Sequence, residues 1–99
     1  MATFIDVKTK EELNGIIAQE KSVIVDFHAT WCGPCKSLGK YLESLPEDIK
    51  IYKVDTGDFI SHDVRSLPTM IKFESGEEET RISGFPDPQS INNFLGYSL

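Results

Sequence analysis

Both cysteines of the chain lie in one short segment, Trp31-Cys32-Gly33-Pro34-Cys35-Lys36. Two residues separate Cys32 from Cys35, a spacing that allows the two sulfurs to close a small disulfide ring. An apolar run typical of a buried strand precedes the segment, and a helical pattern follows it. Cys32 is therefore expected at a helix N-terminus, where unpaired N–H groups and the helix dipole stabilise a thiolate. The sequence predicts that Cys32 is the attacking cysteine.

The spacing of the cysteines fits redox chemistry or metal binding, because two cysteines are too few for a disulfide scaffold. In the redox interpretation, Cys35 breaks the mixed disulfide that Cys32 forms with a substrate, which leaves a Cys32–Cys35 ring. In the metal interpretation, His28 and His62 complete a zinc ligand set, although the paired spacing of a zinc finger is missing. A third interpretation is that the cysteines are small buried hydrophobic side chains. We favour the redox interpretation.

Length, composition and charge restrict the class of protein. A chain of 99 residues is expected to form one domain over residues 1–99, with one core and no room for a nucleotide-binding half. The net charge of −6 argues against direct nucleic-acid binding, and no run of about 18 apolar residues predicts a membrane span. The N-terminus lacks the pattern of a signal peptide, so we expect a cytoplasmic protein.

Hydrophobic periodicity and turn signals predict five strands and four helices. The strands are expected over residues 3–7, 22–29, 49–54, 69–74 and 78–83. The helices are expected from residue 9 to about 20, from 33 or 34 to 45, from 58 to 64, and from 88 to 95. The order β-α-β-α-β-α-β-β-α begins with parallel crossovers and ends with a hairpin. It predicts a three-layer α/β/α sandwich with a central mixed five-stranded sheet.

Two of the helix starts carry capping signals. Thr9 and Glu12 have the spacing of a capping box. Asp87 followed by Pro88 is typical of an N-cap and a first helical residue, and Gly96 is expected to end that last helix.

The helix that follows the cysteines is expected to be amphipathic. Its apolar face contains Cys35, Leu38, Leu42 and Leu45. This face should bury Cys35 and leave Cys32 at the exposed tip of the helix.

The segment Val23-Ile24-Val25-Asp26-Phe27-His28-Ala29-Thr30-Trp31-Cys32-Gly33-Pro34-Cys35-Lys36 resembles the active-site strand, loop and helix start of the thioredoxin family. Leu67-Pro68-Thr69 and the strand after it resemble that family's proline loop, and the similarity continues to Ser83-Gly84. The resemblance implies a thioredoxin fold and a monomeric disulfide reductase that cycles a Cys32/Cys35 dithiol. It also implies protein disulfides as substrates and no cofactor, with electrons supplied by a thioredoxin reductase or a similar donor.

The resemblance also implies roles for further residues. Asp26 matches the family's buried acid and would act as the general base for Cys35. Separately from the resemblance, the spacing of the strands makes Lys53 a candidate to balance the charge of Asp26. The Leu67–Pro68 bond is expected to be cis, with the backbone of Leu67 pairing with an extended substrate segment. The implied substrate-binding residues are Trp31, Gly33, Pro34, Leu67, Pro68 and Gly84.

Three departures from the family pattern leave the redox potential and the choice of partner open. His28 stands where an aromatic residue is usual, and we interpret it as a packing histidine rather than a titrating group. Gly39-Lys40 replaces the proline that kinks the family's helix, and the segment 55–66 is short. Two alternative functions follow from the same sequence. One is a glutaredoxin-like reductase coupled to glutathione, and the other is a non-catalytic binding subunit with a thioredoxin fold.

Overall fold

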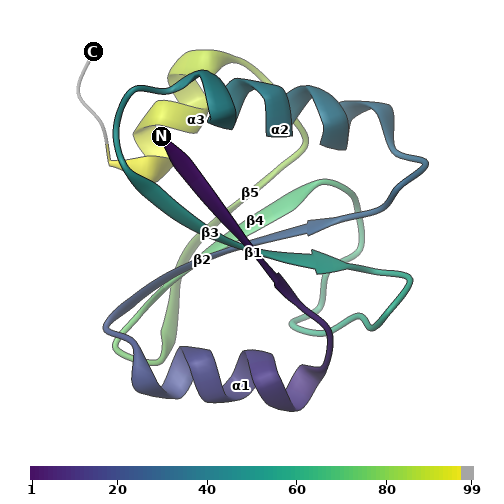
Figure 1. Ribbon diagram of the computed structural model, residues 1–99, viewed down its shortest axis with the longest axis vertical. Helices are drawn as coiled ribbons and strands as arrows, with labels where there is room; N and C mark the ends of the chain where they lie inside the picture. Colours follow the sequence, from purple (N-terminus) through teal and green to yellow (C-terminus); the bar gives the residue numbers. More distant parts are fainter. Residues whose placement is uncertain (97–99) are drawn as a thin grey trace.

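The computed structural model describes residues 1–96, which form a sheet of five strands and three helices (Figure 1). The strands are β1 (Ala2–Val7), β2 (Ser22–His28), β3 (Ile49–Asp55), β4 (Thr69–Glu74) and β5 (Glu77–Ser83). The helices are α1 (Lys10–Gln19), α2 (Gly33–Ser44) and α3 (Pro88–Leu95).

The sheet is mixed, as the sequence predicts. Its strand order is β1-β3-β2-β4-β5. β3 pairs in parallel with both β1 and β2, whereas β4 is antiparallel to β2 and to β5. β2 therefore occupies the centre of the sheet, with a parallel neighbour on one side and an antiparallel neighbour on the other.

The helices cover both faces of the sheet, with α1 on one face and α2 and α3 together on the other (Figure 1). Alternating residues of β2 supply the two cores, since successive side chains of a strand point to opposite faces. Val25 and Phe27 pack in the core beneath α1, and Ile24 packs in the core beneath α2 and α3. By the same alternation, Asp26 and His28 lie on the face of the sheet that α2 covers.

The helix boundaries follow the predicted caps. The Thr9 hydroxyl accepts the backbone N–H of Glu12, and the Glu12 carboxylate accepts the backbone N–H of Lys8. The capping box is therefore present, except that the Glu12 side chain bonds to the residue before the N-cap and not to the N-cap residue Thr9 itself. Asp87 caps α3, and Gly96 ends it at a φ of 88°. None of the helices formed by residues 1–96 has the length and apolar character that a membrane span requires.

The predicted helix over residues 58–64 is wrong, because this segment is a series of turns and irregular backbone. The Asp55 carboxylate accepts the backbone N–H of Gly57 at 2.8 Å, which fixes a turn at the end of β3. His62 and Asp63 then adopt φ values of 57° and 56°, in the left-handed region that interrupts a right-handed helix. Turns therefore take the place of the predicted helix over this segment.

Gly39 lies inside α2, and we expect Gly39→Ala to stabilise the protein. A Cβ at this position would meet no atom within 4 Å, so only the backbone effect remains. Alanine in place of a helical glycine raises the free energy of unfolding by about 0.5–1 kcal/mol. Urea unfolding should show a higher midpoint with an unchanged slope. Gly96→Ala is the contrasting variant, since its positive φ should make it destabilising, and a destabilised Gly39→Ala would contradict the prediction.

Candidate active site

The cysteines lie where β2 ends and α2 begins, at the carboxyl end of the parallel strands, the usual place for a functional site in such a sheet. Cys32 is the N-cap of α2, and Pro34 occupies the first turn. The Cys32 Sγ accepts the backbone N–H of Cys35 at 3.2 Å. The first cysteine therefore sits at the helix N-terminus, as predicted, with a donor directed at its sulfur.

Cys32 and Cys35 form a disulfide with a Cα–Cα distance of 5.3 Å. The predicted small ring is thus present. The two cysteines pack together with Ala29, and Leu67 lies against them.

The prediction that Cys32 is an exposed tip is wrong. Its exposed fraction is 5 %, the same as that of Cys35. The sulfur is bonded to Cys35, and Ala29 and Leu67 cover the pair, which periodicity within one helix does not reveal. Trp31, with an exposed fraction of 79 %, is the residue that projects into solvent.

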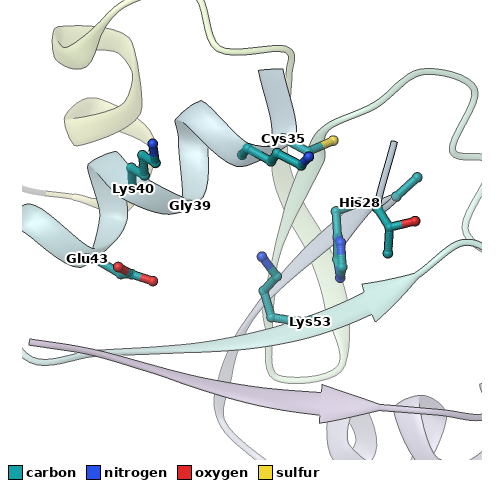
Figure 2. Close-up of a pocket in the computed structure, with 9 residues that line it drawn as sticks. His28, Cys35, Gly39, Lys40, Glu43 and Lys53 are labelled. Carbon is teal, nitrogen blue, oxygen red and sulfur yellow. The ribbon is translucent and has the colours of Figure 1, made fainter. Parts of the chain in front are cut away.

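A cavity lies on each side of the disulfide. The Cys32 cavity has a volume of about 330 Å³ and is lined by Trp31, Cys32, Thr56, Ile60, Val64, Arg65, Ser66 and Leu67. The Cys35 cavity has a volume of about 380 Å³ and is lined by His28, Ala29, Thr30, Cys35, Lys36, Gly39, Lys40, Glu43 and Lys53 (Figure 2). Each buried cysteine therefore borders a different opening to solvent.

Sequence reasoning did not identify Ile60 and Arg65 as neighbours of Cys32. Both belong to the irregular region between β3 and β4, and Ile60 is exposed. The available signal was the pair Phe59-Ile60, two adjacent large apolar residues in a mostly polar stretch. Ile60 and Trp31, both exposed, line the same cavity, and exposed apolar residues that lie together mark contact surfaces.

Asp26 is fully buried on β2, directly opposite Lys53 of β3 in the parallel register. Lys53 Nζ lies 3.3 Å from Asp26 Oδ2, an ion pair in which neither carboxylate oxygen has a well-aligned hydrogen-bond donor. Burial raises the pKa of Asp26, and the charge of Lys53 offsets this effect only in part. The structure thus contains both the buried acid and the lysine pairing expected from the sequence.

His28 is half-buried and lines the Cys35 cavity beside Lys53 (Figure 2). Burial, aided by the positive charge of Lys53, lowers the pKa of His28 below its ordinary value. The neutral form of the ring therefore predominates at pH 7.

His62 packs edge-on against Phe73, with the ring centroids 5.3 Å apart, and its Nδ1 lies 2.7 Å from the Ser61 hydroxyl. Its backbone carbonyl accepts a hydrogen bond from Arg81. Within the part of the chain that the structure describes, no group of three or more His, Cys, Asp or Glu side chains is arranged to hold a metal ion. The two histidines and two cysteines do not converge as a zinc ligand set.

The proline loop lies against the disulfide. The Leu67–Pro68 bond is cis, and the Leu67 side chain contacts the cysteine pair. The Pro68 carbonyl accepts the backbone N–H of Gly84 at 2.8 Å, which brings Gly84 beside this loop. Gly33 and Pro34 are exposed at the start of α2, next to Cys32. Trp31, Gly33, Pro34 and Leu67 therefore lie next to the cysteine pair, and Pro68 and Gly84 belong to the loop contacts beside Leu67.

The sequence profile of the thioredoxin family matches residues 4–96. The chain belongs to the thioredoxin family. It is 39 % identical over 95 residues to Thioredoxin-1 of Saccharomyces cerevisiae, covering 89 % of this chain and 91 % of the yeast protein. It is 35 % identical over 96 residues to the thioredoxin of Mycoplasmoides gallisepticum, covering 90 % of this chain and 96 % of the Mycoplasmoides protein.

Solved thioredoxin structures share the fold. The thioredoxin of Plasmodium falciparum superimposes with a TM-score of 0.77 at 29 % identity, covering 95 % of this chain and 99 % of that one. Family membership together with the Cys32–Cys35 disulfide makes the protein a thiol-disulfide oxidoreductase, a disulfide reductase. Thioredoxins need no separate cofactor, because the cysteine pair itself carries the electrons.

Proposed function

We propose that the protein reduces disulfides of other proteins, with Cys32 as nucleophile and Cys35 as resolving thiol. The observation that carries this assignment is the hydrogen bond from the Cys35 N–H to the Cys32 sulfur at the first turn of α2. In the reduced protein this donor and the helix dipole favour the Cys32 thiolate over the thiol.

Two exchange steps complete the cycle. The Cys32 thiolate attacks one sulfur of the substrate disulfide, forms a mixed disulfide with it, and releases the other substrate sulfur as a thiolate. Cys35 loses its proton and attacks the Cys32 sulfur, which releases the second substrate thiolate and restores the Cys32–Cys35 disulfide. The substrate gains two electrons, and the protein loses two.

Asp26 is proposed as the base that takes the proton of Cys35. It is buried on the strand that leads into the active-site loop, and its raised pKa brings it nearer to neutral pH, where a general base is most effective. The Cys35 cavity borders both Cys35 and Lys53, the ion-pair partner of Asp26. Water in this cavity would reach Cys35 and Lys53, and Lys53 contacts the buried carboxylate.

The proposed substrate surface surrounds the Cys32 cavity. Among described residues the backbone of Leu67 makes no hydrogen bond, so it is available to pair with an extended substrate segment as an added strand. Trp31 offers a flat apolar contact, while the small, exposed Gly33 and Pro34 leave room for a partner beside Cys32.

We further propose that the protein works as a monomer in the cytoplasm, where a thioredoxin reductase or a similar donor restores the dithiol. A reducing compartment suits this cycle, since the oxidised form must be returned to the thiol form. The net charge of −6 supports protein substrates rather than direct contact with nucleic acid. The proposed cycle requires no metal and no bound cofactor.

A redox titration against glutathione buffers tests this proposal. Free thiols are trapped by alkylation and counted by mass. We expect one two-electron transition, at a reduction potential well below that of the cellular glutathione pool. The double variant Cys32→Ser, Cys35→Ser is the control and should show no transition. A transition at or above the potential of the glutathione pool, with faster turnover by glutathione than by thioredoxin reductase, would instead support the glutaredoxin-like alternative.

A further inference from the structure

The Cys35 cavity is positively charged on a protein whose net charge is −6. Three lysines line it, Lys36, Lys40 and Lys53, whereas Glu43 is the single acidic residue of the lining. The neutral His28 ring adds no charge to the balance. The cavity therefore differs in sign from the molecule as a whole.

The lysines that line the cavity belong to two elements. Lys53 extends from β3 toward α2 and has a side-chain exposure of 16 %, while Lys40 lies on α2 with its amine turned away from Lys53 in this view (Figure 2). Lys36 and Lys40 are exposed on α2, and neither forms an ion pair with any residue in the range 1–96. Glu43 is thus the acidic residue that shares the cavity lining with these two lysines, without a direct ion pair to either of them.

The cavity also has room for a ligand. Its volume of about 380 Å³ lies within the range of small-molecule sites. Gly39 contributes to this space, because a Cβ at that position would meet no atom within 4 Å. The pair Gly39-Lys40 thus supplies both space and charge on the same wall.

The third cation, Lys53, has Asp26 as its partner. Burial raises the pKa of Asp26, so protonation of this carboxyl group leaves the largely buried ammonium of Lys53 without a counter-charge. A buried cation without a partner is unfavourable, and an external anion would restore the pairing.

We propose that the Cys35 cavity binds a small oxyanion, a phosphate or carboxylate group, between Lys53 at its floor and Lys36 and Lys40 at its rim. The two groups share the same chemistry, which either a free solute or an acidic group of a bound protein partner can supply. Binding uses no thiol, so it does not depend on the proposed redox cycle. An anion in the cavity competes with Asp26 for Lys53.

A titration of the oxidised, full-length protein with inorganic phosphate at constant ionic strength tests the site. NMR signals of the Gly39 amide and the His28 ring should shift and saturate. Lys36→Gln and Lys40→Gln should each weaken the apparent affinity about two- to fivefold, the effect of losing one exposed ion pair. Gly39→Glu places a carboxylate on the cavity wall and should abolish the saturable shifts.

Lys21→Gln is the matched control, since Lys21 is exposed, forms no ion pair with a described residue, and lies at the opposite end of β2. Its phosphate titration should equal that of the parent. Shifts that grow without saturating, or an equal weakening in Lys21→Gln and Lys40→Gln, would overturn the proposal in favour of general charge screening.

The KM for oxidised insulin, measured with and without phosphate, distinguishes an acidic group of the protein partner from a free solute as the source of the anion. If an acidic group of the protein partner occupies the cavity, added phosphate should raise the KM, and Lys40→Gln should remove this dependence. If the natural ligand is a free solute, phosphate should saturate the His28 signal while the KM stays constant. Both results require that phosphate binds saturably. If the shifts do not saturate, the proposal is wrong whatever the kinetics show.

Discussion

Replacing Cys35 by serine is expected to convert the protein into a covalent trap for its substrates. Cys32 keeps its position as N-cap of α2 and still attacks a substrate disulfide, but no thiol remains at residue 35 to break the mixed disulfide. Multiple turnover should fall by on the order of 10³-fold or more, because the resolving step is lost. Mass spectrometry after mixing with oxidised insulin should show one substrate chain attached to Cys32.

Cys32→Ser is the matched control, since it removes the other sulfur of the same pair. We expect this variant to lose turnover to a similar extent without forming the adduct, because Cys35 lacks the N-cap position and the backbone N–H donor that Cys32 has. The opposite pattern, an adduct on Cys35 in Cys32→Ser and none in Cys35→Ser, would reverse the assigned roles.

Asp26→Asn is expected to make the protein more stable than the parent at neutral and alkaline pH. The pKa of Asp26 is raised in the folded state, so the folded protein holds this proton more tightly than the unfolded chain. The associated stability is fully present below the unfolded pKa of about 3.9 and is lost as the pH rises through the folded pKa. A tenfold difference in proton affinity between the folded and unfolded states corresponds to about 1.4 kcal/mol, and asparagine avoids this loss. In the variant Lys53 loses its carboxylate partner, which reduces the gain in the free energy of unfolding.

The free energy of urea unfolding, measured from about pH 3 to about pH 9, tests this expectation. The difference between Asp26→Asn and the parent should grow with pH in favour of the variant. Glu77→Gln, which changes an exposed carboxylate on β5 that forms no ion pair with a described residue, controls for the loss of one negative charge. A difference that does not vary with pH would show that the carboxylate does not titrate between these limits.

The same variant separates the two proposed exchange steps. Without the carboxylate, release of the mixed disulfide should slow more than its formation, because only Cys35 needs a base. Rapid mixing of reduced protein with oxidised insulin resolves the two phases. Equal slowing of both phases would contradict the assignment of Asp26 as the base for Cys35.

The elements whose boundaries are set by local signals could be predicted from the sequence. Thr9, Asp87 and Gly96 each act on the backbone within a few residues of themselves, and the observed α1 and α3 begin or end where these residues require. The alternating apolar residues of β3 likewise determine which side chains enter each core. Such signals need no knowledge of the rest of the chain.

Features that depend on distant residues could not be predicted from local sequence signals. The segment 58–64 lacks a helix in part because His62 is held by Phe73 and Arg81, which follow it in the chain by 11 and 19 residues. The burial of Cys32 depends on Leu67, and the two cavities combine residues from several elements. The burial of Asp26 could be predicted only through the family resemblance, since its spacing alone allows an exposed position.

The central place of β2 affects the order in which the protein can form during its synthesis. β2 precedes both of its neighbours, β3 and β4, in the chain, so neither edge of β2 can pair until residues 49–55 and 69–74 have emerged from the ribosome. α2 likewise packs against Ile51 and Met70, which follow it. Long-range pairing of this kind forms slowly. The nascent chain therefore carries Cys32 and Cys35 as two unshielded thiols until most of the protein has been made.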